Sequence, residues 1–192
     1  NTTGCRNTAM GYNSLAVNTT GCCNVSIGRT ALDANTEGDF NTAVGNSALS
    51  GNTTADDNTA VGYLAMNANT TGGDNTAVGV CSLNANTTGA NNVAVGFQAL
   101  DTNTTANENV AVGRCSLFAN TEGTKNIAVG SYALDTNTTG DKNVAIGYQA
   151  LDANTTADNN TAAGDSALKA NTTGTGNNAF GAKIKSKTDT KI

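Results

Sequence analysis

The sequence contains no proline, no tryptophan and no histidine among its 192 residues, and aromatic residues make up only 4% of it. Without histidine, neither an ordinary Ser-His triad nor a histidine-based zinc site can be assembled. Charged residues account for 13% of the chain and the net charge is −5, which disfavours nucleic acid and anionic membranes as partners, because both attract basic surfaces. No apolar run approaches the roughly 20 residues of a membrane-spanning helix. We therefore expect no enzyme activity, no cofactor, no metal site, no nucleic-acid partner and no membrane insertion of this segment.

What the chain does contain is a repeated unit, seen for example in residues 69–85, NTTGGDNTAVGVCSLNA. Eleven copies of 17 residues follow one another without insertion or deletion. They begin at Asn1, Asn18, Asn35, Asn52, Asn69, Asn86, Asn103, Asn120, Asn137, Asn154 and Asn171. A fixed period of this kind predicts a solenoid in which each copy is one coil stacked on the next, and the strict register argues against the disorder that an Asn/Thr/Gly-rich composition could suggest.

The domain boundaries follow from the period. Residues 1–182 keep the repeat and are predicted to form an all-β parallel solenoid, a β-roll of eleven coils. The pattern ends from about Lys183, so residues 183–192 are predicted to be a cap or a junction tail. Since the first residue is already position one of a copy, we expect the chain to be a segment of something longer.

Within one copy, the segment NTAVG or NVAVG is typical of a short strand bounded by Asn and Gly. Side chains alternate along a strand, and position eight is Thr, Val or Ile in ten copies, so we predict that positions eight and ten face the core. Positions thirteen to seventeen are predicted to form a second strand with Leu inward, and Asn-Thr-Thr-Gly to make the turn. Stacking places like residues in columns, so the asparagines at positions one and seven are predicted to hydrogen-bond along the rod axis.

The opposite strand face, at positions nine and eleven, carries only small residues in nearly every copy. Our hypothesis is that this face packs against a neighbouring protomer, and the alternative is a thin coil whose two walls meet there. The candidate residues are Ala43, Ala60, Ala77, Ala94, Ala111 and Ala128 with Gly45, Gly62, Gly79, Gly96, Gly113 and Gly130.

Five cysteines are present. Cys5 and Cys22 occupy the same position in successive copies, and coils about 4.8 Å apart would bring their Cα atoms within disulfide range. A disulfide and a column of plain thiols both fit, and Cys23 could replace Cys22. Cys81 and Cys115 are two coils apart, about 9.6 Å by the same spacing, which is too far to pair within one chain.

The motifs NTAVG and NVAIG resemble the head repeats of trimeric autotransporter adhesins (YadA-like heads), whose coils carry a similar N-S-V-A-I-G motif. That resemblance implies a left-handed β-roll that assembles as a trimer and binds extracellular matrix or a host surface. The longer unit, NTAVGYxALxxNTTG, looks even more like repeats in phage and bacterial tail-fibre-type proteins. We therefore expect a homo-oligomer or filament on a cell or virion surface, with a cell-surface or matrix receptor as a second partner.

Position one also supplies N-x-[ST] glycosylation motifs, at Asn52, Asn69, Asn86, Asn103, Asn137 and Asn154 among others. Asparagine persists at position one where Glu37 and Glu122 destroy the motif, which favours a structural role over a glycan.

The repeat also carries two kinds of residue that could form binding surfaces, threonine and aromatic residues. Thr columns at positions two, three and eight could order water, so ice binding is the alternative function, although position eight mixes Thr with Val and Ile. Exposed aromatic residues at position twelve could stack on sugars, but they do not fall on adjacent coils. They are Tyr12, Tyr63, Phe97 and Tyr148. We conclude that the chain is best explained as the rigid shaft of an extracellular fibre.

Overall fold

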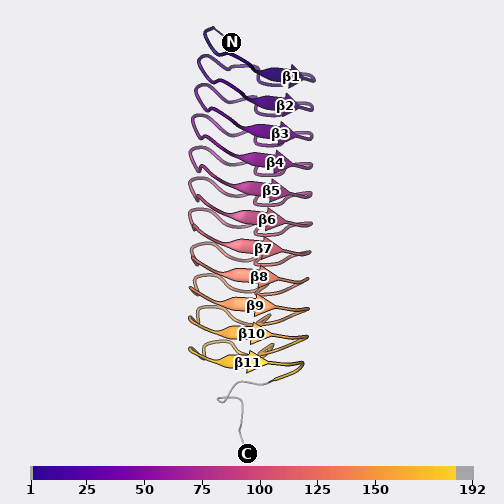
Figure 1. Cartoon of the computed structure of the whole chain (residues 1–192), viewed down its shortest axis with the longest axis vertical. Helices are drawn as coiled ribbons and strands as arrows, with labels where there is room; N and C mark the ends of the chain where they lie inside the picture. The colour runs from indigo at the N-terminus through magenta and orange to yellow at the C-terminus, as the bar shows by residue number, and fades with distance from the viewer. Residues whose placement is uncertain (1, 185–192) are drawn as a thin grey trace, which may run out of the picture.

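The computed structural model describes residues 2–184, and they form a rod of stacked coils with strands on one side (Figure 1). Eleven strands of three residues each make one sheet, and every neighbouring pair is parallel and consecutive in sequence. The strands are β1 (Thr8–Met10), β2 (Val25–Ile27), β3 (Thr42–Val44), β4 (Thr59–Val61), β5 (Thr76–Val78), β6 (Val93–Val95), β7 (Val110–Val112), β8 (Ile127–Val129), β9 (Val144–Ile146), β10 (Thr161–Ala163) and β11 (Asn178–Phe180). The all-β parallel solenoid predicted from the period is thus confirmed.

Each strand residue pairs with the residue at the same position of the next copy, 17 residues later, so the register of the sheet is the same throughout. In β6 and β7, Val93 pairs with Val110 and Ala94 with Ala111. Because no copy has an insertion, the pairing continues without a slip from β1 to β11. At about 4.8 Å per coil, eleven coils give a rod roughly 50 Å long. The predicted tail lies outside the described residues from residue 185 onward.

The direction of the strand faces is the reverse of our prediction. From Ala43 to Ala162 the alanines at position nine are 0% exposed, whereas the residues at positions eight and ten are turned outward, with Ile127 39% and Val129 37% exposed. The prediction that positions eight and ten face the core is therefore wrong. Its basis was β-branching, which favours extended backbone but does not decide which face of a strand is buried.

The small residues proposed as an outer oligomer face are instead buried inside the coils of the same chain. All six candidate alanines, from Ala43 to Ala128, are 0% exposed and belong to the hydrophobic core. They pack there with the Ala or Ser of position fourteen and the Leu of position fifteen, as Ala94, Ala99 and Leu100 show. In strands β2 to β11 position nine holds only Ala or Ser and is buried against the opposite wall of the same coil, so the alternative of two walls meeting is the correct one.

The predicted second strand does not form. Residues 97–102 form turns, and Gln98 (φ 52°) and Leu100 (φ 54°) lie in the left-handed region. This conformation turns both Ala99 and Leu100 inward, which a regular strand cannot do for consecutive residues. The segment still bonds to the next coil, since Leu100 N donates to Ser116 O at 2.9 Å. Leu points inward, as predicted.

The glycine at position eleven makes the corner that follows each strand. Its φ lies between 127° and 142° in every described coil, a region that L-residues rarely adopt. Space is a second requirement: a Cβ built on Gly96 would lie 2.5 Å from the carbonyl oxygen of Gly113 in the next coil. The six candidate glycines therefore allow close stacking of coils within one chain, which accounts for their presence without a second protomer.

Candidate functional site

The asparagines at position one form a hydrogen-bonded column inside the rod. From Asn35 to Asn171, each Nδ2 donates to Oδ1 of the asparagine one coil earlier at 2.8–3.2 Å. Each also donates to the carbonyl oxygen three residues ahead, as Asn86 does to Gly89 at 2.9 Å. Asn1, the first member expected, lies outside the described residues. Since both donated bonds end within the chain, the column closes the turn and joins neighbouring coils.

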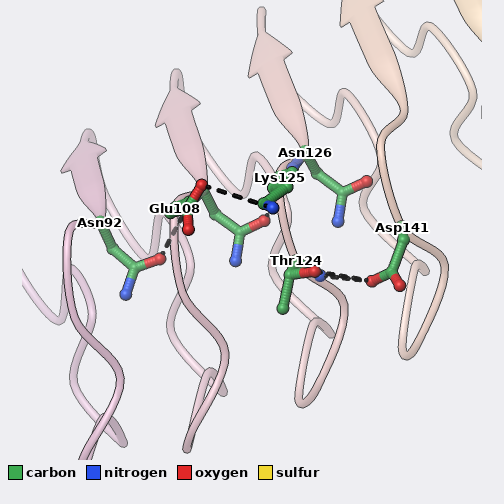
Figure 2. A network of polar contacts seen from close by, with 7 residues as sticks. Asn92, Glu108, Thr124, Lys125, Asn126 and Asp141 are labelled. Atoms are coloured by element: carbon green, nitrogen blue, oxygen red, sulfur yellow. Dashed lines mark hydrogen bonds and ion pairs between the residues drawn. The ribbon is translucent and has the colours of Figure 1, made fainter.

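A second asparagine column runs along position seven, beside the strands (Figure 2). Oδ1 of Asn92 accepts the backbone N–H of Asn109 at 3.0 Å, and its Nδ2 donates to Ala106 O at 2.9 Å. In Figure 2 the amides of Asn92 and Asn126 point the same way in their separate coils. Within residues 2–184, no buried side-chain nitrogen or oxygen lacks a hydrogen-bond partner. The buried asparagines are therefore a structural lattice and have no spare polar group for a ligand.

This lattice bears on the glycosylation motifs. The six position-one asparagines considered as acceptors, Asn52 to Asn154, are 0% exposed, and a glycan would have to attach to the same Nδ2 that makes both bonds. The folded rod thus leaves no room for glycans on this column. Asn159, which lies at position six of its copy and begins another N-x-[ST] motif, is by contrast exposed.

Threonine at position two, predicted above as one of the surfaces that could order water, forms a third column. Oγ1 of Thr87 donates to Thr104 O at 3.0 Å, and Thr104 donates in turn to Thr121 O at 3.3 Å. The pattern runs without a break from Thr2 to Thr155. These hydroxyl protons are committed to the backbone of the next coil, so the column contributes to stacking and presents no free hydroxyl donors.

Charged side chains occupy the turn before the strands, and Figure 2 shows the contact between Glu108 and Lys125 of neighbouring coils. Lys125 lies 3.8 Å from Glu108, and both side chains are more than half exposed. Asp141 is different, because its Oδ1 accepts the backbone N–H of Thr124 at 2.7 Å. An exposed ion pair such as Lys125–Glu108 contributes little to stability. The Asp141 carboxylate contributes more, because it gives the backbone N–H of Thr124 a charged acceptor in the neighbouring coil.

The outward face of the sheet is an uncharged surface that runs along the rod. No strand residue from β1 to β11 carries a charge, and positions eight and ten present mainly Thr, Val and Ile. Val78, Ile127, Val129 and Ile146 are 37–46% exposed along it.

No family model, curated protein or solved structure matches the chain. Inferences about function therefore depend on the surfaces of the rod itself.

Within residues 2–184, no three His, Cys, Asp or Glu side chains are placed to hold a metal ion, and no helix in that range is long and apolar enough to cross a membrane. A pocket of about 530 Å³ lies at the C-terminal end, lined by residues that include Asp152, Lys169 and Lys183. Its one carboxylate is paired with Lys169 at 3.8 Å, and the pocket presents no nucleophile activated by a base.

The cysteines are arranged as the period requires. All five are free thiols, and Sγ of Cys5 lies 2.9 Å from Sγ of Cys22 in the next coil. The hydrogen bond that Cys5 donates to Cys22 raises the pKa of the Cys5 thiol. The pair is thus within reach of a disulfide but reduced, and both alternatives from the sequence analysis remain chemically accessible.

We expect oxidised glutathione to convert Cys5 and Cys22 into a disulfide. A thiolate of the pair attacks glutathione disulfide and releases one glutathione, and the second thiol then displaces the other. Because the thiolate is the nucleophile, the reaction should accelerate at alkaline pH. Intact mass should fall by two hydrogens, and peptide mapping should join residues 5 and 22. Cys81 and Cys115 are the internal control, and a cross-link between them, or only mixed glutathione adducts at Cys5, would contradict this expectation.

Proposed function

We propose that the chain is the rigid shaft of an extracellular fibre, in which copies associate side by side through the outward face of the sheet. The observation that carries the proposal is that an eleven-stranded parallel sheet has one face uncovered. Sheets composed only of parallel strands occur almost exclusively with both faces covered. Here the inner face is covered by the turn segments of positions thirteen to seventeen, whereas the outer face carries exposed Val and Ile along the rod.

The partner best suited to that face is a second copy of the chain. The face repeats at about 4.8 Å over the whole length of the rod. A partner that packs against it without a growing mismatch must have the same repeat, and another copy satisfies that requirement by construction. Absence of charge on the strands removes the like-charge repulsion that a chain of net charge −5 would otherwise meet at a self-interface.

A shaft also agrees with how the rod is stabilised. Two buried Asn columns and one partly exposed Thr column of hydrogen bonds run from coil to coil along the rod, so stiffness arises everywhere along the chain instead of at one site. Resemblance to adhesin heads and tail-fibre repeats supports a trimer on a cell or virion surface. In that setting a stiff rod would hold binding surfaces away from the particle and increase avidity when several copies engage together.

Replacing Val129 with Lys tests the association. Val129 lies in β8 on the outward face, so an ammonium group there would have to be buried without a partner if two copies meet. We expect the wild-type chain to have the mass of an oligomer, three chains if the resemblance holds, and Val129→Lys to shift it to one chain by light scattering. Thr105→Lys, exposed at position three, adds the same charge elsewhere and should leave the oligomer intact. A monomeric wild type, or dissociation by both variants, would refute the interface.

Ice binding has less support from the geometry. Thr2 to Thr155 at position two donate their hydroxyl protons to backbone carbonyls, as described above. At position eight, threonines follow one another in only three consecutive coils, at Thr42, Thr59 and Thr76, before Val93 interrupts them. A thermal hysteresis measurement separates the two functions, because a shaft should give none.

A further inference from the structure

Four side chains on successive coils form a continuous strip at the corner after the strands. Phe97, Arg114, Tyr132 and Tyr148 come from the coils that contain β6, β7, β8 and β9. The Arg114 guanidinium carbon lies 5.9 Å from the ring centre of Phe97 and 5.5 Å from that of Tyr132. Tyr132 and Tyr148 then meet edge to face, with ring centres 6.2 Å apart and planes at 84°. The strip thus covers three coil steps, roughly 14 Å at 4.8 Å per step.

The residues of the strip do not all share one position of the repeat, so no single column of the repeat contains them. Phe97, Arg114 and Tyr148 occupy position twelve, but Tyr132 occupies position thirteen and fills the gap left by Ser131. Phe97 is 46% and Tyr148 50% exposed, so much of the aromatic surface remains in solvent after these contacts are made. Guanidinium and ring contacts of this length are favourable and hold the side chains in place.

Polar groups accompany the strip along the neighbouring columns. Gln98 Nε2 donates to Asp101 Oδ2 at 3.2 Å, and Gln149 Oε1 accepts a bond from Lys169 Nζ at 2.7 Å. Partial burial raises the pKa of Asp101 and of Asp135. Hydrogen-bonding groups, including partly buried carboxylates, therefore occupy the same coils as Phe97, Tyr132 and Tyr148.

The geometry points to a binding site for a neutral glycan chain on this strip. A sugar ring has an apolar face of C–H groups that packs on an aromatic ring, and hydroxyl edges that both donate and accept hydrogen bonds, so it needs both features together. A linear glycan also presents one ring after another along its length, and the strip places aromatic rings on three of four successive coils. Three carboxylates, Asp101, Asp135 and Asp152, exceed the cations Arg114 and Lys169, and this balance disfavours sulfated or uronic-acid chains.

The site is separate from the interface proposed above. It lies at the corner after the strands, in positions twelve, thirteen and sixteen, and not on the outward face of the sheet. A failure of glycan binding would therefore leave the association of copies untouched, and the converse also holds.

Aromatic NMR signals of the full chain, titrated with cellohexaose, laminarihexaose and chitohexaose, test the proposal. At least one of these neutral hexasaccharides should shift the ring signals of Tyr132 and Tyr148 in a saturable way and leave Tyr63 unmoved. Tyr132→Ala and, separately, Tyr148→Ala should each weaken binding about tenfold, the loss expected for one aromatic contact.

Tyr63→Ala is the matched control, since Tyr63 also occupies position twelve and is 49% exposed, but Asn46 and Val80 hold that position in the adjacent coils. Its affinity should equal that of the wild type. The proposal is overturned if no neutral hexasaccharide shifts the Tyr132 and Tyr148 signals, if Tyr63→Ala weakens binding as much as Tyr132→Ala, or if a heparin hexasaccharide binds more tightly than the neutral probes.

Discussion

Replacing Gly96 with Ala should cost about 3 kcal/mol or more of unfolding free energy and break the rod in its middle. Two causes act together at this corner. The φ of 138° is a conformation that alanine adopts only under strain, and the new Cβ would lie 2.5 Å from Gly113 O and 2.7 Å from its carbonyl carbon. Since both clashing atoms are backbone of the next coil, neither can rotate away, and the coils must separate.

Urea unfolding and limited proteolysis measure this effect. In a solenoid each coil contacts only its neighbours, so we expect a lowered midpoint and new cleavage near residues 96–113, with the outer coils still protected. Gly73→Ala is the control: Gly73 has no left-handed φ, its nearest new contact would be 3.2 Å from Asp56 O, and the next coil already has Ala90 at the same position. If the urea midpoints of Gly96→Ala and Gly73→Ala fall equally, the positive φ and close contact at position eleven are not the reason for its glycine.

The architecture was predictable because it depends on spacing alone. An unbroken 17-residue period fixes parallel, in-register stacking whatever the cross-section of the coil, and this is what β1 to β11 show. Columns of hydrogen-bonding asparagine follow from the same stacking, since an invariant Asn has its counterpart one coil away. Leu100 and its equivalents were assigned inward correctly, because a large aliphatic residue retained at one position in a thin rod has nowhere else to pack.

The cross-section was not predictable from the same pattern. Alternation at NTAVG divides the strand into two faces but does not say which is inside, and burial then depends on the distance to the opposite wall. That distance is set by Gln98 and Leu100, whose left-handed φ values fold the return segment close to the sheet. Neither residue type signals such a conformation, as the left-handed region is disfavoured for both. The wall is therefore close, only Ala or Ser lies beneath strands β2 to β11, and Val and Ile face outward.

The candidate surfaces show a similar limit. The strip from Phe97 to Tyr148 depends on Tyr132 reaching across from the adjacent position, and on Arg114 bridging two coils. Column-by-column inspection separates these residues, whereas the fold brings them together. A useful signal would have been the density of aromatic and Arg residues at positions twelve and thirteen of neighbouring copies, taken jointly.

The interior column gives the second large effect, which we expect from Asn86→Asp. The two side chains have nearly the same shape, so packing is preserved and only the chemistry changes. Asn86 Nδ2 donates to Asn69 Oδ1 at 2.8 Å and to Gly89 O at 2.9 Å. In the variant an oxygen faces both of those oxygens, and a charge is buried at a site that is 0% exposed. We expect a loss of at least about 4 kcal/mol at neutral pH, because two acceptors lose their donor and the carboxylate has no cation.

Asn91→Asp is the matched control, with the same substitution and the same change in net charge five residues away. Asn91 is exposed, and Asp57 and Asp74 already occupy its position with the same left-handed φ, so its urea midpoint should equal that of the wild type. Acidification should restore part of the stability of Asn86→Asp alone, since a protonated carboxyl can again donate one of the two bonds. If the two variants have the same urea midpoint, or if the difference between their midpoints does not change with pH, then net charge and not the hydrogen-bonded column would govern stability. A selective, acid-reversible loss at Asn86 would instead show that the column joins each coil to the next, which is the property a rigid shaft needs.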